Sequence, residues 1–166
     1  MEKFNHIELN NEVTKRGDNG FFKLEKDVEA IEEFLREVDF RTVKFSSEMK
    51  RLRYLVEENF YYNIFDKYIE DEILECLELA ANFKFEFKSY MAASKFYKDY
   101  ALKTNDKKQY LENYNQHVFI VAMYLADGNV SLAKELMISM LEQRVQPATP
   151  TFLNSGRSRR GELVSC

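Results

Sequence analysis

The chain has 166 residues, a length that suits one domain or two small domains that share a core. Its 45% hydrophobic and 31% charged residues are the balance of a globular protein and exclude the disordered class, and a net charge of −4 argues against a generic nucleic-acid binder. The scarcity of glycine (five) and proline (two) favours helices over a loop-rich or all-β fold.

Targeting and metal signals are weak throughout. No apolar run approaches the roughly 18 residues of a membrane span, and no signal-peptide core follows the opening Met1–His6, so we expect a cytoplasmic protein with no membrane contact. Two cysteines are too few for a secreted disulfide framework, and no Cys/His spacing suits zinc. We therefore predict no metal site in this chain.

Helical periodicity dominates the first half. Apolar residues recur at helical spacing across Lys26–Asp39, and Ser46 and Ser47 can cap a second helix whose apolar stripe extends to Phe60. A third helix is predicted over Asp71–Ala81. Alternation in Phe83–Phe87 then favours a short extended connector, which we take as the boundary between two helical subdomains.

The same pattern resumes after the connector. Ser89 can cap a helix over Tyr90–Lys103, and Thr104–Asp106 has turn composition. A helix from about Gln109 to Ala126 is apolar nearly all round in its second half, which is typical of deep burial. After a turn at Asp127–Asn129, which also offers Asn129 as a cap, paired i, i+4 rows predict one more helix ending near Leu141.

The character changes after Arg144. Pro147 and Pro150 cannot continue a helix, so we expect a non-helical tail after Pro147. Glu162–Cys166 could form a strand, but its partners are absent, so the sequence has the look of an incomplete polypeptide. We expect Leu163, Val164 and Cys166 to lack strand partners, and order to weaken beyond Gly156.

Four stretches carry a family resemblance. The run Gln146–Cys166 resembles the segment that enters the catalytic barrel of bacterial class Ib ribonucleotide reductase large subunits, and Ser89–Asp106 is similar to a helical block of the same family. Ile7–Val13 and Tyr54–Glu57 match the family's opening region. The resemblance covers essentially this whole chain and about the first quarter of a complete large subunit.

The resemblance implies an all-α architecture that ends at the first strand of an α/β barrel which is missing here. Residues 1–86 would form the helical amino-terminal domain, residues 87–156 the ribonucleotide reductase all-α domain, and residues 157–166 the truncated start of the barrel. No complete regulatory ATP cone fits before Ser89. A nucleotide could still bind in the shortened opening, around Thr42 to Ser47.

The resemblance also implies chemistry. The family reduces the ribose 2′-hydroxyl of a ribonucleoside diphosphate: a thiyl radical removes the 3′ hydrogen, and a cysteine pair then gives a proton and two electrons and closes to a disulfide. Cys166 aligns with the member of that pair on the first barrel strand. Taken without its context, Cys166 would be read as a small apolar residue at the start of a strand. Ser165 and Thr149 align with positions that hold the substrate's diphosphate, where hydroxyls are good donors. Their alternatives are an ordinary strand residue and a turn hydroxyl.

Other candidate residues have structural interpretations. We read Arg157, Arg159 and Arg160 as solvated loop charge in preference to phosphate contacts, and Cys76 as a buried structural thiol on an apolar stripe. His6 and His117 lack ligand partners and suggest no metal.

The family further implies partners and cofactors. These are the remainder of the large subunit, a small subunit that carries a dinuclear-metal radical, a glutaredoxin-like or thioredoxin-like dithiol reductant, nucleotide effectors, and the ribonucleoside diphosphate. None of the cofactors is expected to be bound by this chain itself.

Two functional hypotheses follow. The first is an enzyme fragment, inactive alone, that contributes diphosphate contacts and one redox-active cysteine to ribonucleoside diphosphate reduction. The alternative is a non-catalytic helical module, derived from that enzyme, which binds a nucleotide or a subunit. Reconstitution with the complementary part of a large subunit discriminates the two.

Overall fold

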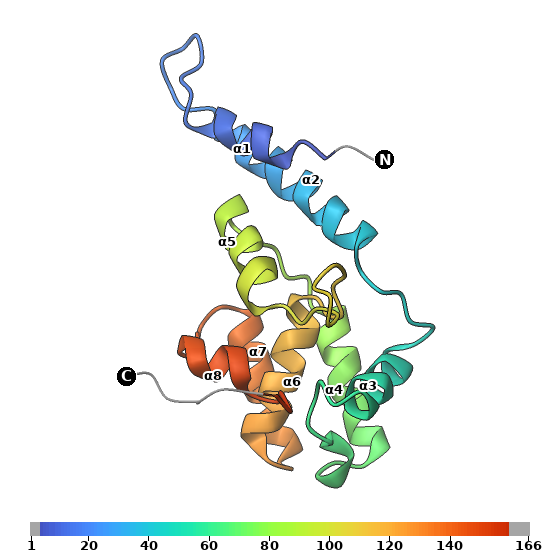
Figure 1. Ribbon diagram of the computed structural model, residues 1–166. Helices are drawn as coiled ribbons and strands as arrows, with labels where there is room; N and C mark the ends of the chain where they lie inside the picture. The colour runs from blue at the N-terminus through green and yellow to red at the C-terminus, as the bar shows by residue number, and fades with distance from the viewer. Residues whose placement is uncertain (1–3, 160–166) are drawn as a thin grey trace. The chain divides into compact units, whose positions relative to one another are not determined.

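The regular structure of the chain is helical (Figure 1), in a computed structural model that describes residues 4–159. Over this range no β-strand forms, and the only β-pairings are isolated bridges such as Arg16 with Phe22. The prediction of an all-α chain is confirmed. In chain order the elements are α1 (His6–Val13), α2 (Glu25–Phe40), α3 (Glu48–Glu57), the 3-10 turn η1 (Ile64–Asp66), α4 (Glu70–Asn82), α5 (Tyr90–Lys95), the π-helical turn η2 (Phe96–Tyr100), α6 (Tyr114–Ala126), α7 (Val130–Leu141) and α8 (Thr149–Asn154).

These elements form two compact units that interleave along the sequence. The first unit combines the residues up to Val43 with Glu86–Glu112, and the second combines Lys44–Phe85 with the residues from Asn113 onward. The predicted boundary after residue 86 separates two domains that follow one another along the sequence, whereas each of these units takes residues from both sides of it. The domain boundary stays a prediction.

In the first unit, α1 and α5 pack against α2 (Figure 1). The α2 helix buries Ala30, Phe34 and Val38, which recur every four residues and so share one face. Around Phe34 lie the rings of His6, Tyr90 and Tyr97, at centroid distances of 5.2, 5.7 and 5.9 Å. The helix predicted over Lys26–Asp39 is confirmed within one residue at each end.

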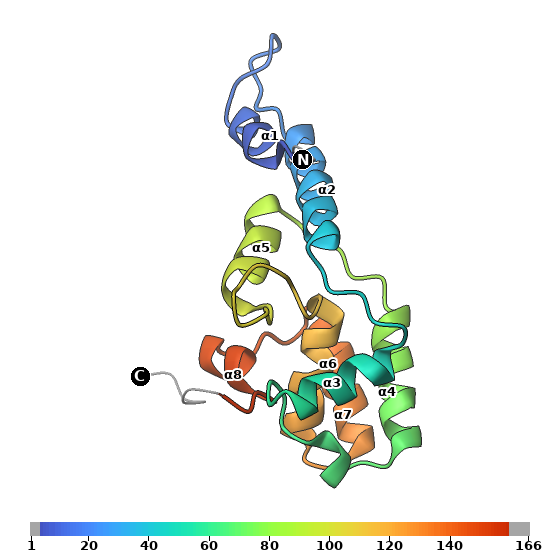
Figure 2. The same cartoon turned by 45° about the vertical axis from the view of Figure 1, so that its right-hand side comes forward.

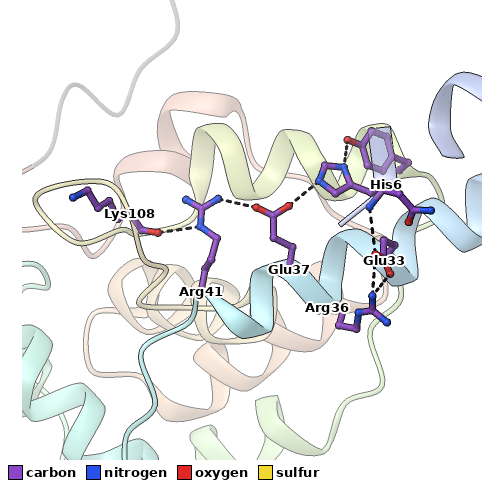
Figure 3. A network of polar contacts seen from close by, with 8 residues as sticks. His6, Glu33, Arg36, Glu37, Arg41 and Lys108 are labelled. Atoms are coloured by element: carbon purple, nitrogen blue, oxygen red, sulfur yellow. Dashed lines mark hydrogen bonds and ion pairs between the residues drawn. The ribbon is translucent and has the colours of Figure 1, made fainter. Parts of the chain in front are cut away.

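A polar network joins α1 to α2 and α5 (Figure 3). Glu37 accepts from His6 Nε2 at 2.8 Å and from Arg41 Nη1 at 3.2 Å. Because a carboxylate only accepts, His6 Nε2 must carry a proton, and its Nδ1 lies 2.8 Å from the Tyr90 hydroxyl. Arg41 Nε also donates to the Lys108 carbonyl at 3.0 Å. These contacts matter because α1 itself contains no buried residue.

The predicted helix Tyr90–Lys103 is too long. Ser89 caps α5 as expected, its hydroxyl accepting from the Ala92 N–H, but the last turn is π-helical and ends at Tyr100. The predicted start of the next helix at Gln109 is also wrong, because α6 begins at Tyr114. The Tyr110 and Leu111 N–H groups donate to the carbonyls of Arg41 and Leu102. Because these acceptors lie outside the predicted helix, its first residues are held in a non-helical conformation and α6 starts later.

In the second unit, α6 packs against α4 and α7 (Figure 2). The run Val118–Met123 has no exposed surface, which confirms the deep burial expected from a helix that is apolar all round. Cys76 on α4 is equally buried. The predicted caps at Ser47 and Asn129 are confirmed, since their side chains accept from the N–H groups of Lys50 and Leu132.

The prediction of a non-helical tail after Pro147 is wrong. Thr149–Asn154 forms the short helix α8, with Pro150 in its first turn. Proline lacks only an N–H that the first helical turn leaves without an intrahelical acceptor, and its fixed φ suits a helix start. Pro150 is therefore compatible with the first turn of a helix and does not terminate it. The expectations for Leu163, Val164 and Cys166 lie outside the described residues.

Candidate functional site

The candidate site lies at the carboxyl end of the second unit, where α8 leads toward the residues proposed for catalysis. Thr149 is the first residue of α8 and is exposed. Ser165 and Cys166, the other two predicted site residues, lie beyond residue 159 and outside the described range. The geometry that can be described is therefore that of the segment from Thr149 to Arg159.

Backbone bonds fix this segment against the loop after α3. The Tyr62 N–H donates to the Gly156 carbonyl and the Ser158 N–H donates to the Phe60 carbonyl, both at 3.0 Å. Gly156 has a φ of +77°, and a Cβ at this position would lie 2.6 Å from Cγ1 of Ile120 on α6. Only glycine satisfies both the left-handed backbone and the contact with α6.

A buried side-chain pair adds a second attachment to α6. His117 is 0% exposed and Arg157 is 8% exposed. Arg157 Nη2 lies 3.0 Å from His117 Nδ1, and His117 Nε2 lies 2.8 Å from the carbonyl oxygen of Phe152. The Arg157 guanidinium also lies over the Tyr61 ring, 5.5 Å from its centroid. We refer to His117, Arg157, Tyr61 and Phe152 as the His117–Arg157 cluster.

Hydrogen-bond chemistry fixes the tautomer of His117. A guanidinium only donates and a carbonyl only accepts, so Nδ1 must be the acceptor and Nε2 must carry the proton. In this neutral form His117 connects the Phe152 carbonyl in α8 to the side chain of Arg157. One imidazole thus holds two points of the same segment on α6.

Two hydroxyl groups nearby are buried. Ser155 is 0% exposed, and neither its Oγ nor the Tyr62 hydroxyl has a hydrogen-bond partner within the described part of the chain. Burial raises the pKa of the Tyr62 phenol, with smaller contributions from Tyr68 and Asp127, so this group stays neutral. The ring of Tyr124 packs edge-on against Tyr62, 5.1 Å away between centroids.

Comparison with known proteins identifies the chain. Two family models match it in succession: "Ribonucleotide reductase N-terminal" over residues 6–85 and "Ribonucleotide reductase, all-alpha domain" over residues 86–160. The chain belongs to the ribonucleotide reductase large-subunit family.

Individual relatives agree with this family. The chain is 47% identical over 164 residues to the ribonucleoside-diphosphate reductase NrdEB subunit alpha of Bacillus subtilis, which covers 98% of this chain and 15% of the relative. It is 48% identical to the ribonucleoside-diphosphate reductase subunit alpha of the same organism, covering 96% and 23%. The corresponding protein of Mycoplasma pneumoniae is 42% identical, covering 97% and 22%. The chain therefore spans less than a quarter of the length of these relatives, and the NrdEB match agrees with the predicted class Ib.

Within the ribonucleotide reductase chain, the arginine run differs from its predicted role. Arg157 is buried in the His117–Arg157 cluster, so its interpretation as solvated loop charge is wrong. Arg159 is exposed, as expected, and Arg160 lies outside the described residues. His117 was also missed as a residue with a structural role, although a histidine next to the all-apolar run Val118–Met123 must be buried with partners.

Cys76 is a buried structural thiol. Burial raises the pKa of the Cys76 thiol, an effect that Lys134 partly offsets, so the thiol stays protonated and packs as an apolar group. Between residues 4 and 159, no group of three or more His, Cys, Asp or Glu side chains could hold a metal ion. No helix in the same range is long and apolar enough to cross a membrane.

In the predicted nucleotide-binding stretch around Thr42 to Ser47, two hydroxyl groups make hydrogen bonds within the chain. The Thr42 hydroxyl donates to the Val38 carbonyl at 2.7 Å, and the Ser47 hydroxyl caps α3. Nucleotide binding there stays a prediction.

Proposed function

We propose that this chain contributes substrate-diphosphate contacts and one redox-active cysteine to the reduction of ribonucleoside diphosphates to deoxyribonucleoside diphosphates. The observation that carries the proposal is the uninterrupted family match over residues 6–160, with relatives aligned over almost the whole chain. The roles of Cys166, Thr149 and Ser165 in this proposal rest on their place in the closing motif of that family.

In this proposal Cys166 is one of the two thiols that reduce the substrate. After a thiyl radical has removed the 3′ hydrogen, the pair delivers two protons and two electrons in total: one proton leaves with the 2′ oxygen as water, the other hydrogen takes its place at C2′, and the two sulfurs form a disulfide. The hydrogen held by the radical cysteine then returns to C3′. Thr149 and Ser165 donate hydrogen bonds to the diphosphate. Cys76 is unsuited to the redox role, since its thiol is fully buried and its pKa is raised.

These 166 residues contain only Cys76 and Cys166, so the second reducing cysteine and the radical cysteine must come from elsewhere. We therefore propose that the chain acts with the remainder of a large subunit, a radical-bearing small subunit that holds a dinuclear metal centre, and a glutaredoxin-like or thioredoxin-like reductant. Nucleotide effectors would act on that assembly. Alone, the chain should reduce no ribonucleotide.

The decisive experiment measures deoxyribonucleotide formation after the chain is joined to, or mixed with, the remainder of a large subunit. We expect Cys166→Ser to abolish multiple turnover, because a hydroxyl cannot form the disulfide that delivers the electrons. The matched control is Cys76→Ala, which should leave turnover at the parental value. If Cys166→Ser turns over like the parent while Cys76→Ala is inactive, the cysteine assignment is wrong. A parental mixture without activity would favour the non-catalytic binding module.

Thr149 gives a smaller and different effect. In the active assembly, Thr149→Val should raise the KM for the ribonucleoside diphosphate by the equivalent of about 1–3 kcal/mol, since one phosphate hydrogen bond is left unmade. Steady-state kinetics across substrate concentrations measure the effect. An unchanged KM would assign Thr149 the turn role that its position at the start of α8 also allows.

A further inference from the structure

The His117–Arg157 cluster joins a rigid helix to the segment that leads toward Cys166. His117 stands on α6 beside the run Val118–Met123, which has no exposed surface, so its backbone has little room to move. Arg157 stands in the segment after α8, which continues toward the proposed catalytic residues. A hydrogen bond between the two therefore relates the position of that segment to the core of the second unit.

The hydrogen bonds of the cluster have defined donors, acceptors and directions, which apolar packing lacks. Arg157 donates to His117 Nδ1, and this requires the Nε2–H tautomer, which in turn donates to the Phe152 carbonyl. The backbone hydrogen bonds between Tyr62 and Gly156 and between Ser158 and Phe60 also hold this segment. Replacing a buried polar pair by apolar residues is often neutral for stability, so stability alone does not account for this arrangement.

We propose that His117 and Arg157 are positioning residues for the redox cysteine: they fix where the chain leaves the helical unit and so set the path to Ser165 and Cys166. This inference rests on the proposed function. Neither residue touches substrate in this account, and each acts through the segment that Arg157 anchors. Misplacing a reacting group by about 1 Å can cost roughly 100-fold in rate, so a modest loosening of this segment is sufficient for a large effect.

The test uses single-turnover reduction by the complete assembly, without external reductant, so that only the reaction of the cysteine pair is followed. His117→Gln keeps an amide donor toward Phe152 but offers Arg157 no acceptor at the Nδ1 position. His117→Asn places an amide oxygen near that position and keeps the acceptor. Arg157→Gln removes the guanidinium. Ile73→Val, a buried change on α4 at a residue outside the cluster, is the control for lowered stability.

We expect His117→Gln and Arg157→Gln to lower the single-turnover rate per folded subunit, at saturating substrate, by about 10- to 100-fold. His117→Asn should retain more activity than His117→Gln. The double variant should be no worse than the more damaged single variant, because both changes break one connection. Ile73→Val should lower the unfolding temperature and leave the rate alone.

The inference is overturned if the cluster variants lower only the unfolding temperature, as Ile73→Val does, while the single-turnover rate stays parental. That result would leave the proposed function intact, since the parental assembly and the Cys166→Ser variant report on it separately. If the parental assembly itself forms no deoxyribonucleotide, the proposed function fails and the positioning role fails with it.

Discussion

In the second unit the whole run Val118–Met123 of α6 is without exposed surface, whereas in the first unit α1 buries no residue at all. The most exposed aromatic and aliphatic side chains of the α1–α2 region include Phe21 at 75%, Leu24 at 68% and Phe40 at 67%. The first unit depends on aromatic contacts around Phe34 and on the polar network centred on Glu37. Since apolar burial is the main driving force of folding, the second unit should be the more stable of the two.

The largest expected effect tests this comparison at one phenylalanine in each unit. Phe119→Ala, at a fully buried site on α6, should lower the free energy of unfolding by about 3–5 kcal/mol because neighbouring helices cannot close the cavity. Phe34→Ala, at a site 9% exposed, should cost less than Phe119→Ala because solvent already reaches part of the side chain. Urea unfolding measures both values. Equal costs would indicate that the two cores are equally rigid.

A pair of glycines sharpens the comparison in the loops. Gly156 (φ +77°) and Gly20 (φ +79°) have nearly the same positive φ, but of the two only Gly156 would place a Cβ within 4 Å of other atoms. Gly156→Ala should therefore cost about 2–4 kcal/mol from overpacking and strain together, while Gly20→Ala should cost only the roughly 1–2 kcal/mol of a left-handed alanine. Thermal unfolding of the two variants checks the difference. If Gly156→Ala is as mild as Gly20→Ala, Ile120 must be free to move.

The smallest effect concerns the polar network of Figure 3. Glu37→Gln should destabilise the first unit by about 1–2 kcal/mol, because one amide cannot replace both hydrogen bonds of the carboxylate. Amide hydrogen exchange should quicken in α1 and remain unchanged in α6. The control is Arg36→Gln. The Arg36 side chain is 60% exposed and pairs with Glu33 near solvent, so this change should cost about 0–1 kcal/mol. Faster exchange in α6 would contradict an effect confined to the first unit.

The helices that could be predicted are those governed by local signals. The spacing of apolar residues located α2 to within one residue at each end, and the Ser47, Ser89 and Asn129 caps located the starts of α3, α5 and α7. In these cases the information lies within one or two turns of the element itself.

The features that were missed depend on partners far away in the sequence. The α6 helix starts later than predicted because the N–H groups of Tyr110 and Leu111 donate to the carbonyls of Arg41 and Leu102. Arg157 looked like a solvent-exposed charge because its partner His117 is 40 positions away. At the candidate site, only Thr149 among the three predicted residues lies in the described range, so the assignments of Ser165 and Cys166 rest on the family motif.

The interleaving of the two units affects how the chain can fold as it is synthesised. The chain passes from one unit to the other after Val43, after Phe85 and after Glu112, so no single cut separates the units. On a ribosome, α1 and α2 emerge early but must wait for α5 and the loop that follows it before their unit is complete. The buried helix α6 emerges later still, and until then the face of α4 that packs against it stays uncovered. Folding should therefore be completed late and nearly together in both units, with the pairing of Phe60 and Ser158 among the last contacts to form.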